Sequence, residues 1–270
     1  MAEELLTARL GERRREFRAE LAAADRLLAP TVEMAETSER LYGRASGSIE
    51  VLHPGLSRKI PPLHAAQRRA PWDGRRPLSI LCFGERRPDS GLLDLVHALR
   101  GLPRNTFELV ITGAEGDAEY EARLHDASLG LPVHFFGPYR TTQLATVASA
   151  CDLAAFPAQS PLGRAQAVEE ALALGLPVWC TDQADGARWI VRDETRNASS
   201  VALASAPGRI LPAGDAAAWT RAFEALLRTP DQLTEQRKAI PDEFGTAADA
   251  ARELGRLFDD LLAHTVRQAS

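Results

Sequence analysis

The sequence is poor in residues that mark several large classes of protein. Of its 270 residues only two are lysine and three are cysteine, and the formal net charge is −5. A negative balance argues against nucleic acid as the main partner, because binding to a phosphate backbone needs an excess of basic side chains. Cys82, Cys151 and Cys180 are odd in number and lie in apolar runs, which predicts buried free thiols and no disulfide framework.

Membrane spans, a signal peptide and metal-ligand motifs are also missing. No apolar run reaches the roughly 18 residues of a membrane-spanning helix, and the beginning of the chain is too charged for a signal peptide. We therefore expect a cytoplasmic protein. The basic run at residues 13–15 allows at most peripheral membrane contact, and a solvated helix face is the preferred interpretation. The six histidines show no HxxxH spacing and the cysteines no CxxC spacing, so no metal and no bound cofactor are predicted.

Two regions of different character follow one another along the chain. Residues 1–76 combine helical patterns with a brief strand at 49–52 and a segment at 57–76 whose arginine and proline content indicates a linker. In residues 77–270 short apolar runs bounded by glycine or proline alternate with helical runs, as in parallel βαβ units. We expect two domains with these ranges. The second is an α/β domain with a doubly wound, Rossmann-like parallel sheet, and extra helices lie at both ends of the chain.

The expected elements of the second domain can be placed by residue number. Strands are predicted at 78–83, 107–113, 131–137, 151–157, 176–181 and 208–212. Helices are predicted at 91–102, 118–128, 141–150, 165–175, 215–228, 230–240 and 245–266. Asp215 is the expected N-cap of the helix that follows it. The strands show no strict alternation of polar and apolar residues, as expected where helices cover both faces of a sheet.

The turns after these strands form the candidate ligand site, because doubly wound sheets bind ligands beyond the carboxyl ends of their strands. Glycines let backbone N–H groups approach a phosphate, and a helix N-terminus adds about half a positive charge. The candidates are Gly84, Gly113, Gly137 and the pair Gly163 and Arg164, which suits a diphosphate best because a predicted helix begins there. The same glycines also fit plain tight turns.

The segment GERRPDSG after the first predicted strand is not the GxGxxG fingerprint of dinucleotide-binding proteins. This difference argues against a dinucleotide-dependent dehydrogenase.

Two adjacent glutamates, Glu169 and Glu170, interrupt an otherwise apolar helical run. A carboxylate accepts hydrogen bonds, so on a helix that begins at a nucleotide it can hold the ribose hydroxyls. Adjacent glutamates are also common on solvent-facing surfaces. The spacing alone leaves both interpretations open.

Several blocks of the sequence resemble one family. The segment VEEALALGLPVWCT at 168–181 resembles the Glu-Ala-x-Ala-x-Gly-x-Pro-Val stretch of retaining glycosyltransferases with the GT-B fold, family four, the glycosyl transferases group 1. ILCFGERRPDSGLLDLVHAL, FELVITG, VHFFGPY and CDLAAFPAQSPLG resemble other family blocks in the same order. The segments ADRLLAPTVEMAETSERLYG and IEVLHPGLS look like the end of the family's first domain, so the resemblance covers residues 24–260.

This resemblance implies a domain that binds a nucleotide-activated sugar donor. It implies that Glu170 holds the donor ribose and that a basic clamp holds the diphosphate. Arg86, Arg87 and Arg164 are the arginines that can supply this clamp, since guanidinium groups bind phosphate well. Tyr139, at the end of the block VHFFGPY, completes the candidate donor-binding residues.

The chain departs from the family pattern at several of these positions. The family's arginine after the first glycine, and its lysine five residues later, correspond here to Glu85 and Ser90. The family's other glutamate, eight residues before Glu170, corresponds to Leu162, and a further acidic position corresponds to Trp189. The residues before the second domain are also too few for a complete first GT-B domain, which in the family binds most of the acceptor.

Three functions follow from these observations. The first is the donor-binding half of a glycosyltransferase that moves a sugar from a nucleotide-sugar to an unidentified acceptor, in glycan or surface polysaccharide synthesis. A separate acceptor-binding domain or partner glycosyltransferase would then complete it. The departures at the donor site favour an alternative, a catalytically inactive binding or scaffold module that pairs with an active partner. The third is another Rossmann-type nucleotide-binding protein, such as an epimerase.

Overall fold

The computed structural model describes residues 17–56, 69–160, 165–184, 186–187, 190 and 206–268. The chain divides into two compact units, Leu56–Gly245 and a smaller unit that joins Met1–Gly55 with Thr246–Ser270.

These units divide the chain differently from the predicted ranges of 1–76 and 77–270. The predicted boundary falls inside the larger unit because Trp72 is buried in its core. The predicted C-terminal helix, in turn, belongs to the smaller unit.

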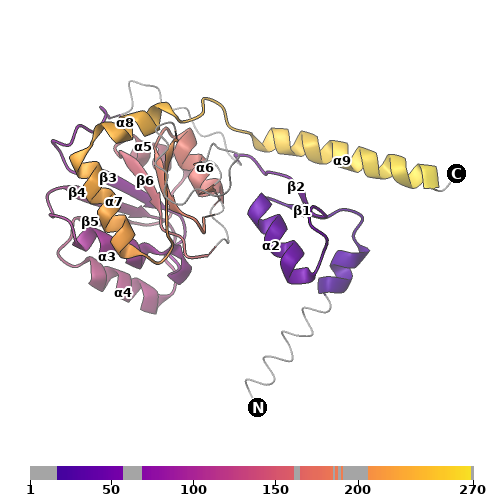
Figure 1. Ribbon diagram of the computed structural model, residues 1–270, viewed down its shortest axis with the longest axis horizontal. Coiled ribbons are helices and arrows are strands. Elements are labelled where there is room, and N and C mark those ends of the chain that lie inside the picture. The colour runs from indigo at the N-terminus through magenta and orange to yellow at the C-terminus, as the bar shows by residue number, and fades with distance from the viewer. Residues whose placement is uncertain are drawn as a thin grey trace, which may run out of the picture. The chain divides into compact units, whose positions relative to one another are not determined.

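Within the described residues, six parallel strands form the sheet of the larger unit, in the order β5-β4-β3-β6-β7-β8 (Figure 1). The strands are β3 (Leu78–Phe83), β4 (Phe107–Thr112), β5 (Val133–Phe136), β6 (Leu153–Phe156), β7 (Val178–Thr181) and β8 (Gly208–Leu211). From β3 the chain adds β4 and then β5 on one side of the sheet, and from β6 it adds β7 and then β8 on the other side. This topology confirms the predicted doubly wound, Rossmann-like sheet.

Helices cover both faces of this sheet. They are α3 (Leu92–Arg100), α4 (Ala118–Ser128), α5 (Thr141–Ser149), α6 (Ala165–Ala173), α7 (Ala216–Arg228) and α8 (Asp231–Lys238). Leu78, Ile80 and Cys82 of β3 pack in a core with α3, α4 and α7. Leu81 and Phe83 of the same strand pack in a second core with α5 and α6. Every residue of β3 is therefore buried, as expected for a strand covered on both sides.

Side-chain caps set where two of these helices begin. The side chain of Asp215 accepts a hydrogen bond from the backbone N–H of Ala218 at 2.8 Å, so its predicted role as the N-cap of α7 is confirmed. Asp117 caps α4 in the same way, through the backbone N–H groups of Glu119 and Tyr120. Each cap satisfies donors that the first turn of a helix leaves without an intrahelical partner.

The smaller unit contains short elements and two longer helices. They are a helical segment at 17–23, β1 (Leu28–Ala29), α2 (Val32–Tyr42), β2 (Glu50–Val51) and α9 (Ala247–Gln268). β1 pairs in parallel with β2, and α2 ends at Gly43, whose φ of 66° lies in the left-handed region. Of the helices in the described ranges, none has both the length and the apolar character that a membrane crossing needs.

All three cysteines are free and buried, which confirms the predicted thiols. Burial raises the pKa of Cys151 and that of Cys180 to about 12, so both thiols stay protonated at neutral pH. The thiol of Cys82 donates to the carbonyl oxygen of Ala155 at 3.0 Å. These side chains are therefore part of the core and are chemically quiet.

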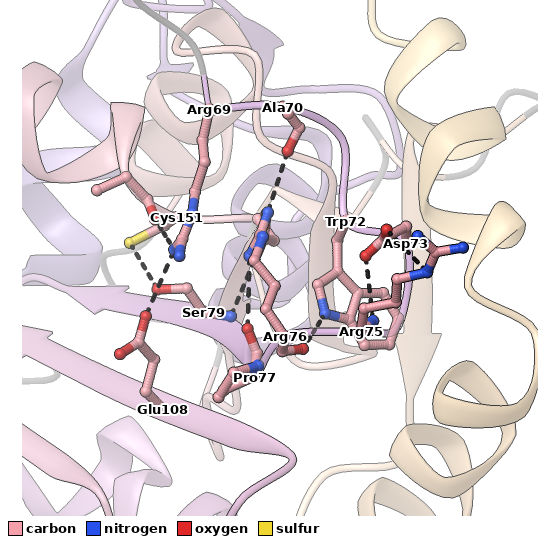
Figure 2. A network of polar contacts seen from close by, with 12 residues as sticks. Arg69, Ala70, Trp72, Asp73, Arg75, Arg76, Pro77, Ser79, Glu108 and Cys151 are labelled. Carbon is pink, nitrogen blue, oxygen red and sulfur yellow. Dashed lines mark hydrogen bonds and ion pairs between the residues drawn. The ribbon is translucent and has the colours of Figure 1, made fainter.

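A buried carboxylate anchors the segment that leads into β3, at the edge of the sheet opposite the candidate site. The fully buried Asp152 accepts one hydrogen bond from each terminal nitrogen of Arg76, both at 2.6 Å, and one from the backbone N–H of Ser79 at 3.0 Å. Arg76 also donates to the carbonyl oxygen of Ala70 and accepts the indole N–H of Trp72 on its own carbonyl oxygen (Figure 2). The hydrogen bonds that Arg76 donates to Asp152 raise the pKa of Arg76, against the cost of burial, so its guanidinium stays charged.

Replacing Arg76 by methionine should lower the free energy of unfolding by about 3 kcal/mol, because the buried carboxylate of Asp152 then loses its charged partner. Urea unfolding followed by circular dichroism measures this change. Arg75 provides the matched control, since its side chain is 91% exposed and lies 3.7 Å from Asp73. Arg75→Met should change the stability by less than about 0.5 kcal/mol, and equal losses in the two variants would contradict the assignment.

Candidate functional site

The sheet has its switch point between β3 and β6, where the strand order reverses. β3 continues into the loop at residues 84–91, and β6 continues into residues 157–160. In sheets of this kind ligands bind outside the carboxyl ends of the two strands that flank the switch point. The candidate site therefore lies at these two loops, with the loops after β4 and β5 next to that of β3.

Close backbone contact joins the loops that follow β3 and β4. Gly84 and Gly113 have positive φ angles of 117° and 150°. A β-carbon on Gly113 would lie 1.8 Å from the carbonyl oxygen of Gly84, and one on Gly116 would lie 1.9 Å from that of Arg86. A β-carbon on Gly137 would instead meet no atom within 4 Å. Gly113 and Gly116 are thus needed for the close packing of the loops, whereas Gly137 has open space beside it.

Arg86 lies below these loops and is 1% exposed. Its Nε donates to both carboxylate oxygens of Glu121, at 2.9 and 3.0 Å, and a terminal nitrogen donates to the carbonyl oxygens of Gly113 and Phe136, both at 3.1 Å. The other terminal nitrogen lies 3.4 Å from the carboxylate of Glu115. Since these groups occupy the guanidinium inside the protein, Arg86 holds the ends of β3, β4 and β5 together. The predicted contact between Arg86 and a donor diphosphate is not supported by this placement.

Arg87 lies at the switch point and is bound to Asp89. Its side chain is 48% exposed and donates two hydrogen bonds to the Asp89 carboxylate, at 3.1 and 2.7 Å. Asp89 also accepts the hydroxyl of Ser160, at 3.0 Å, from the loop after β6. Burial raises the pKa of Asp89, but the hydrogen bonds from Ser160 and Arg87 outweigh it, so this pKa lies below its ordinary value. Asp89 is therefore a carboxylate at neutral pH.

The two positions where the family has a basic clamp carry no cation. Glu85 is exposed, and Ser90 is buried with its hydroxyl 3.3 Å from that of Tyr120. Tyr139 packs edge-on against Phe83, with 5.9 Å between the ring centres, and is partly buried. Its ring is therefore part of the core beside the candidate site.

The structure separates the two adjacent glutamates of α6. Glu169 is completely buried, between Val168 and Ala171 in the second core, whereas Glu170 is only partly buried. Of the two, Glu170 is the one with a surface that a ligand can reach. Burial thus excludes a solvent-facing position for Glu169, and the ribose-binding role of Glu170 stays a prediction.

Two of the predicted site residues, Gly163 and Arg164, lie outside the described residues, as do Leu162 and Trp189. Among the residues that the structure describes, no group of three or more histidine, cysteine, aspartate or glutamate side chains is arranged to hold a metal ion.

Three residues of this edge were not found by the sequence analysis: Asp89, Glu121 and Ser160. Glu121 lies in the first turn of α4, where an acidic residue is ordinary and gives no signal of a buried partner. Asp89 and Ser160 are 71 positions apart, so no local pattern connects them.

The larger unit matches one protein family over most of its length. The family model for glycosyl transferases group 1 matches residues 68–242, more than half of the chain and the whole parallel sheet. The chain belongs to this family. The resemblance inferred from the sequence is thereby confirmed.

A curated relative supports this membership. D-inositol 3-phosphate glycosyltransferase of Xylanimonas cellulosilytica is 31% identical over 250 residues, which cover 87% of this chain and 57% of the relative. The chain thus spans less than two thirds of the length of that group 1 glycosyltransferase.

Solved structures show the same fold. Sucrose-phosphate synthase from Thermosynechococcus elongatus superposes with a TM-score of 0.71 at 22% identity, over 94% of this chain and 62% of that chain. Anabaena Alr3699/HepE in complex with UDP and glucose superposes with a TM-score of 0.67 at 16% identity, over 87% of this chain and 63% of that chain.

Replacing Gly113 by alanine should lower the free energy of unfolding by about 2 kcal/mol or more, because the added methyl group meets the backbone of Gly84 and the positive φ disfavours a side chain. Thermal and urea unfolding measure the loss. Gly137→Ala is the matched control, and we expect a change below about 1 kcal/mol. A larger loss for Gly137→Ala than for Gly113→Ala would refute the described loop contact.

Replacing Glu121 by glutamine should lower the free energy of unfolding by about 2 kcal/mol, because the buried guanidinium of Arg86 then loses its main counter-charge. Glu115→Gln changes a second carboxylate near the same arginine, but Glu115 is 76% exposed. Its substitution should cost less than about 0.5 kcal/mol. Urea unfolding of both variants at neutral pH gives the comparison, and the opposite order of stabilities would show that the buried pair has been misassigned.

Proposed function

We propose that this chain binds the nucleotide-sugar donor of a group 1 glycosyltransferase and takes part in transfer of the sugar to an acceptor. The observation that carries the proposal is the family match over residues 68–242, which spans the sheet and the two loops at its switch point. The solved Anabaena protein with UDP and glucose supports a nucleotide-sugar as the ligand of this fold.

Glu170 is the proposed ribose-binding residue. It lies on α6, whose N-terminal end follows the loop after β6, and it is the partly exposed member of the glutamate pair. A carboxylate accepts the hydrogen bonds that two neighbouring ribose hydroxyls donate.

The diphosphate is proposed to bind between the loops after β3 and β6. The backbone N–H of Gly163 and the start of α6 would meet its charge, with Arg87 and Arg164 as the arginines able to approach it. As the bond between the sugar and the diphosphate breaks, these groups stabilise the charge on the leaving diphosphate. The proposal includes no metal ion and no bound cofactor.

The proposal names a nucleotide-sugar donor and an acceptor, and it specifies no particular sugar, base or acceptor. Because the chain spans 57% of its curated relative, an acceptor-binding domain or partner glycosyltransferase is proposed to complete the reaction. The proposed setting is cytoplasmic synthesis of a glycan or surface polysaccharide. A scaffold without catalysis is favoured by Glu85 and Ser90, which stand where the family has basic residues, and by Leu162 and Trp189, which stand where it has acidic ones.

Glu170→Ala should weaken binding of UDP or GDP, whichever nucleotide the wild-type chain prefers, by about 10- to 100-fold, as expected for lost hydrogen bonds to a charged group. Isothermal titration calorimetry with each nucleotide measures the affinity, and a thermal shift assay confirms folding. Glu224→Ala on α7 is the matched control, because Glu224 is also a partly buried helical glutamate.

Two results would overturn this proposal. The first is a wild-type chain whose melting temperature does not respond to millimolar UDP, GDP or their sugars. The second is equal nucleotide affinity in the wild type and Glu170→Ala, with both proteins folded.

A further inference from the structure

The only described arginine that reaches the switch point with an exposed side chain is engaged by a carboxylate of its own loop. Nε and a terminal nitrogen of Arg87 donate to the two carboxylate oxygens of Asp89, at 3.1 and 2.7 Å. This is the two-pronged arrangement in which a guanidinium also binds the oxygens of a phosphate. Asp89 therefore occupies the face of Arg87 that a diphosphate would use.

Contacts from the other side of the switch point hold Asp89 in place. The hydroxyl of Ser160 donates to its carboxylate at 3.0 Å, and the backbone N–H of Gln159 donates to its carbonyl oxygen at 2.9 Å. The side-chain amide of Gln159 also donates to the carboxylate of Asp94 on α3, at 2.5 Å. The pair of Arg87 and Asp89 thus lies in the loop that follows β3, where this loop contacts the one that follows β6, and the fold places a ligand there.

Because the pair is exposed, breaking the ion pair between Arg87 and Asp89 costs little free energy. The side chains of Arg87 and Asp89 are 48% and 33% exposed, so water screens their attraction and replaces the bonds that break. Arg86 differs in this respect, because its guanidinium is buried and bound to groups of α4, of the loop after β4 and of β5. Of the two neighbouring arginines, only Arg87 can leave its carboxylate without exposing a buried charge.

We infer that Asp89 is a competing carboxylate that limits the affinity of the donor site, and that Arg87 passes from Asp89 to the donor diphosphate when the nucleotide-sugar binds. The inference rests on the proposed function and names a residue that opposes binding within that site. Asp89 acts in two ways, since it occupies the guanidinium of Arg87 and places a negative charge beside the incoming phosphates.

The direction in which one substitution changes the nucleotide affinity tests this inference. Asp89→Asn keeps an oxygen that accepts the Ser160 hydroxyl but removes the charge, so it should bind UDP or GDP about fivefold more tightly than the wild type, the effect of one exposed ion pair. Arg87→Met should bind the nucleotide about fivefold less tightly, since the donor loses a charged ligand. Calorimetry with the full chain gives both affinities.

Two controls separate this role from a structural one. Asp94→Asn removes the same charge from the same edge, but among the described residues Asp94 contacts the amide of Gln159 and no arginine, so the affinity should stay within about twofold. Ser160→Ala removes a hydrogen bond that positions Asp89 and keeps the charge, and it should not tighten binding. A merely structural Asp89 predicts weaker binding on substitution, the opposite sign.

A double substitution tests the exchange of partners. In the Arg87→Met background, Asp89→Asn should give a smaller gain than in the wild type, because no guanidinium remains to be released. In the wild-type background, the gain in affinity from Asp89→Asn should also be larger for the nucleoside diphosphate than for the monophosphate.

The outcomes distinguish this inference from the proposed function. Wild-type binding of UDP or GDP with no gain in Asp89→Asn over Asp94→Asn would overturn the inference and leave the proposed function standing. The absence of nucleotide binding in the wild type and in Asp89→Asn would overturn both.

Discussion

The buried guanidinium of Arg86 holds the carboxyl edge of the sheet together. It follows β3, donates to carbonyl oxygens at the ends of β4 and β5, and is neutralised by Glu121. A charge in the interior is tolerated only when its hydrogen bonds are satisfied, so these partners fix one arrangement of the three loops. The close backbone contact between Gly84 and Gly113 depends on that arrangement.

This use of arginine has a consequence for the charge at the candidate site. The guanidinium of Arg86 is bound to groups inside the protein, and that of Arg87 is bound to Asp89. Glu85 and Ser90 stand where the family resemblance places basic residues, and neither carries a positive charge. In the proposed function, the negative charge of a donor is therefore met by a backbone amide, by the start of α6, by Arg164 and by Arg87, which must first be released from Asp89. A site of this kind relies on shape and exchange of partners more than on a fixed basic clamp.

Much of the fold could be predicted because the apolar runs of buried parallel strands are easily found. The first strand was expected at 78–83 and is β3, Leu78–Phe83, and the cap of α7 was expected and observed at Asp215. The candidate site was predicted less completely. Arg86 and Arg87 are adjacent and alike in sequence, yet one is buried below the loops and the other lies at the switch point.

The sequence by itself determined where strands and helices follow one another along the chain, that the sheet is parallel, and the family. These follow from local apolar patterns and from the order of motifs. Only the tertiary structure decided which of two neighbouring side chains turns inward, as for Arg86 beside Arg87 and Glu169 beside Glu170. The physical reason is that the deciding partners come from elsewhere in the chain. Glu121 is 35 positions from Arg86, and such contacts exist only after the sheet has brought the loops to one edge.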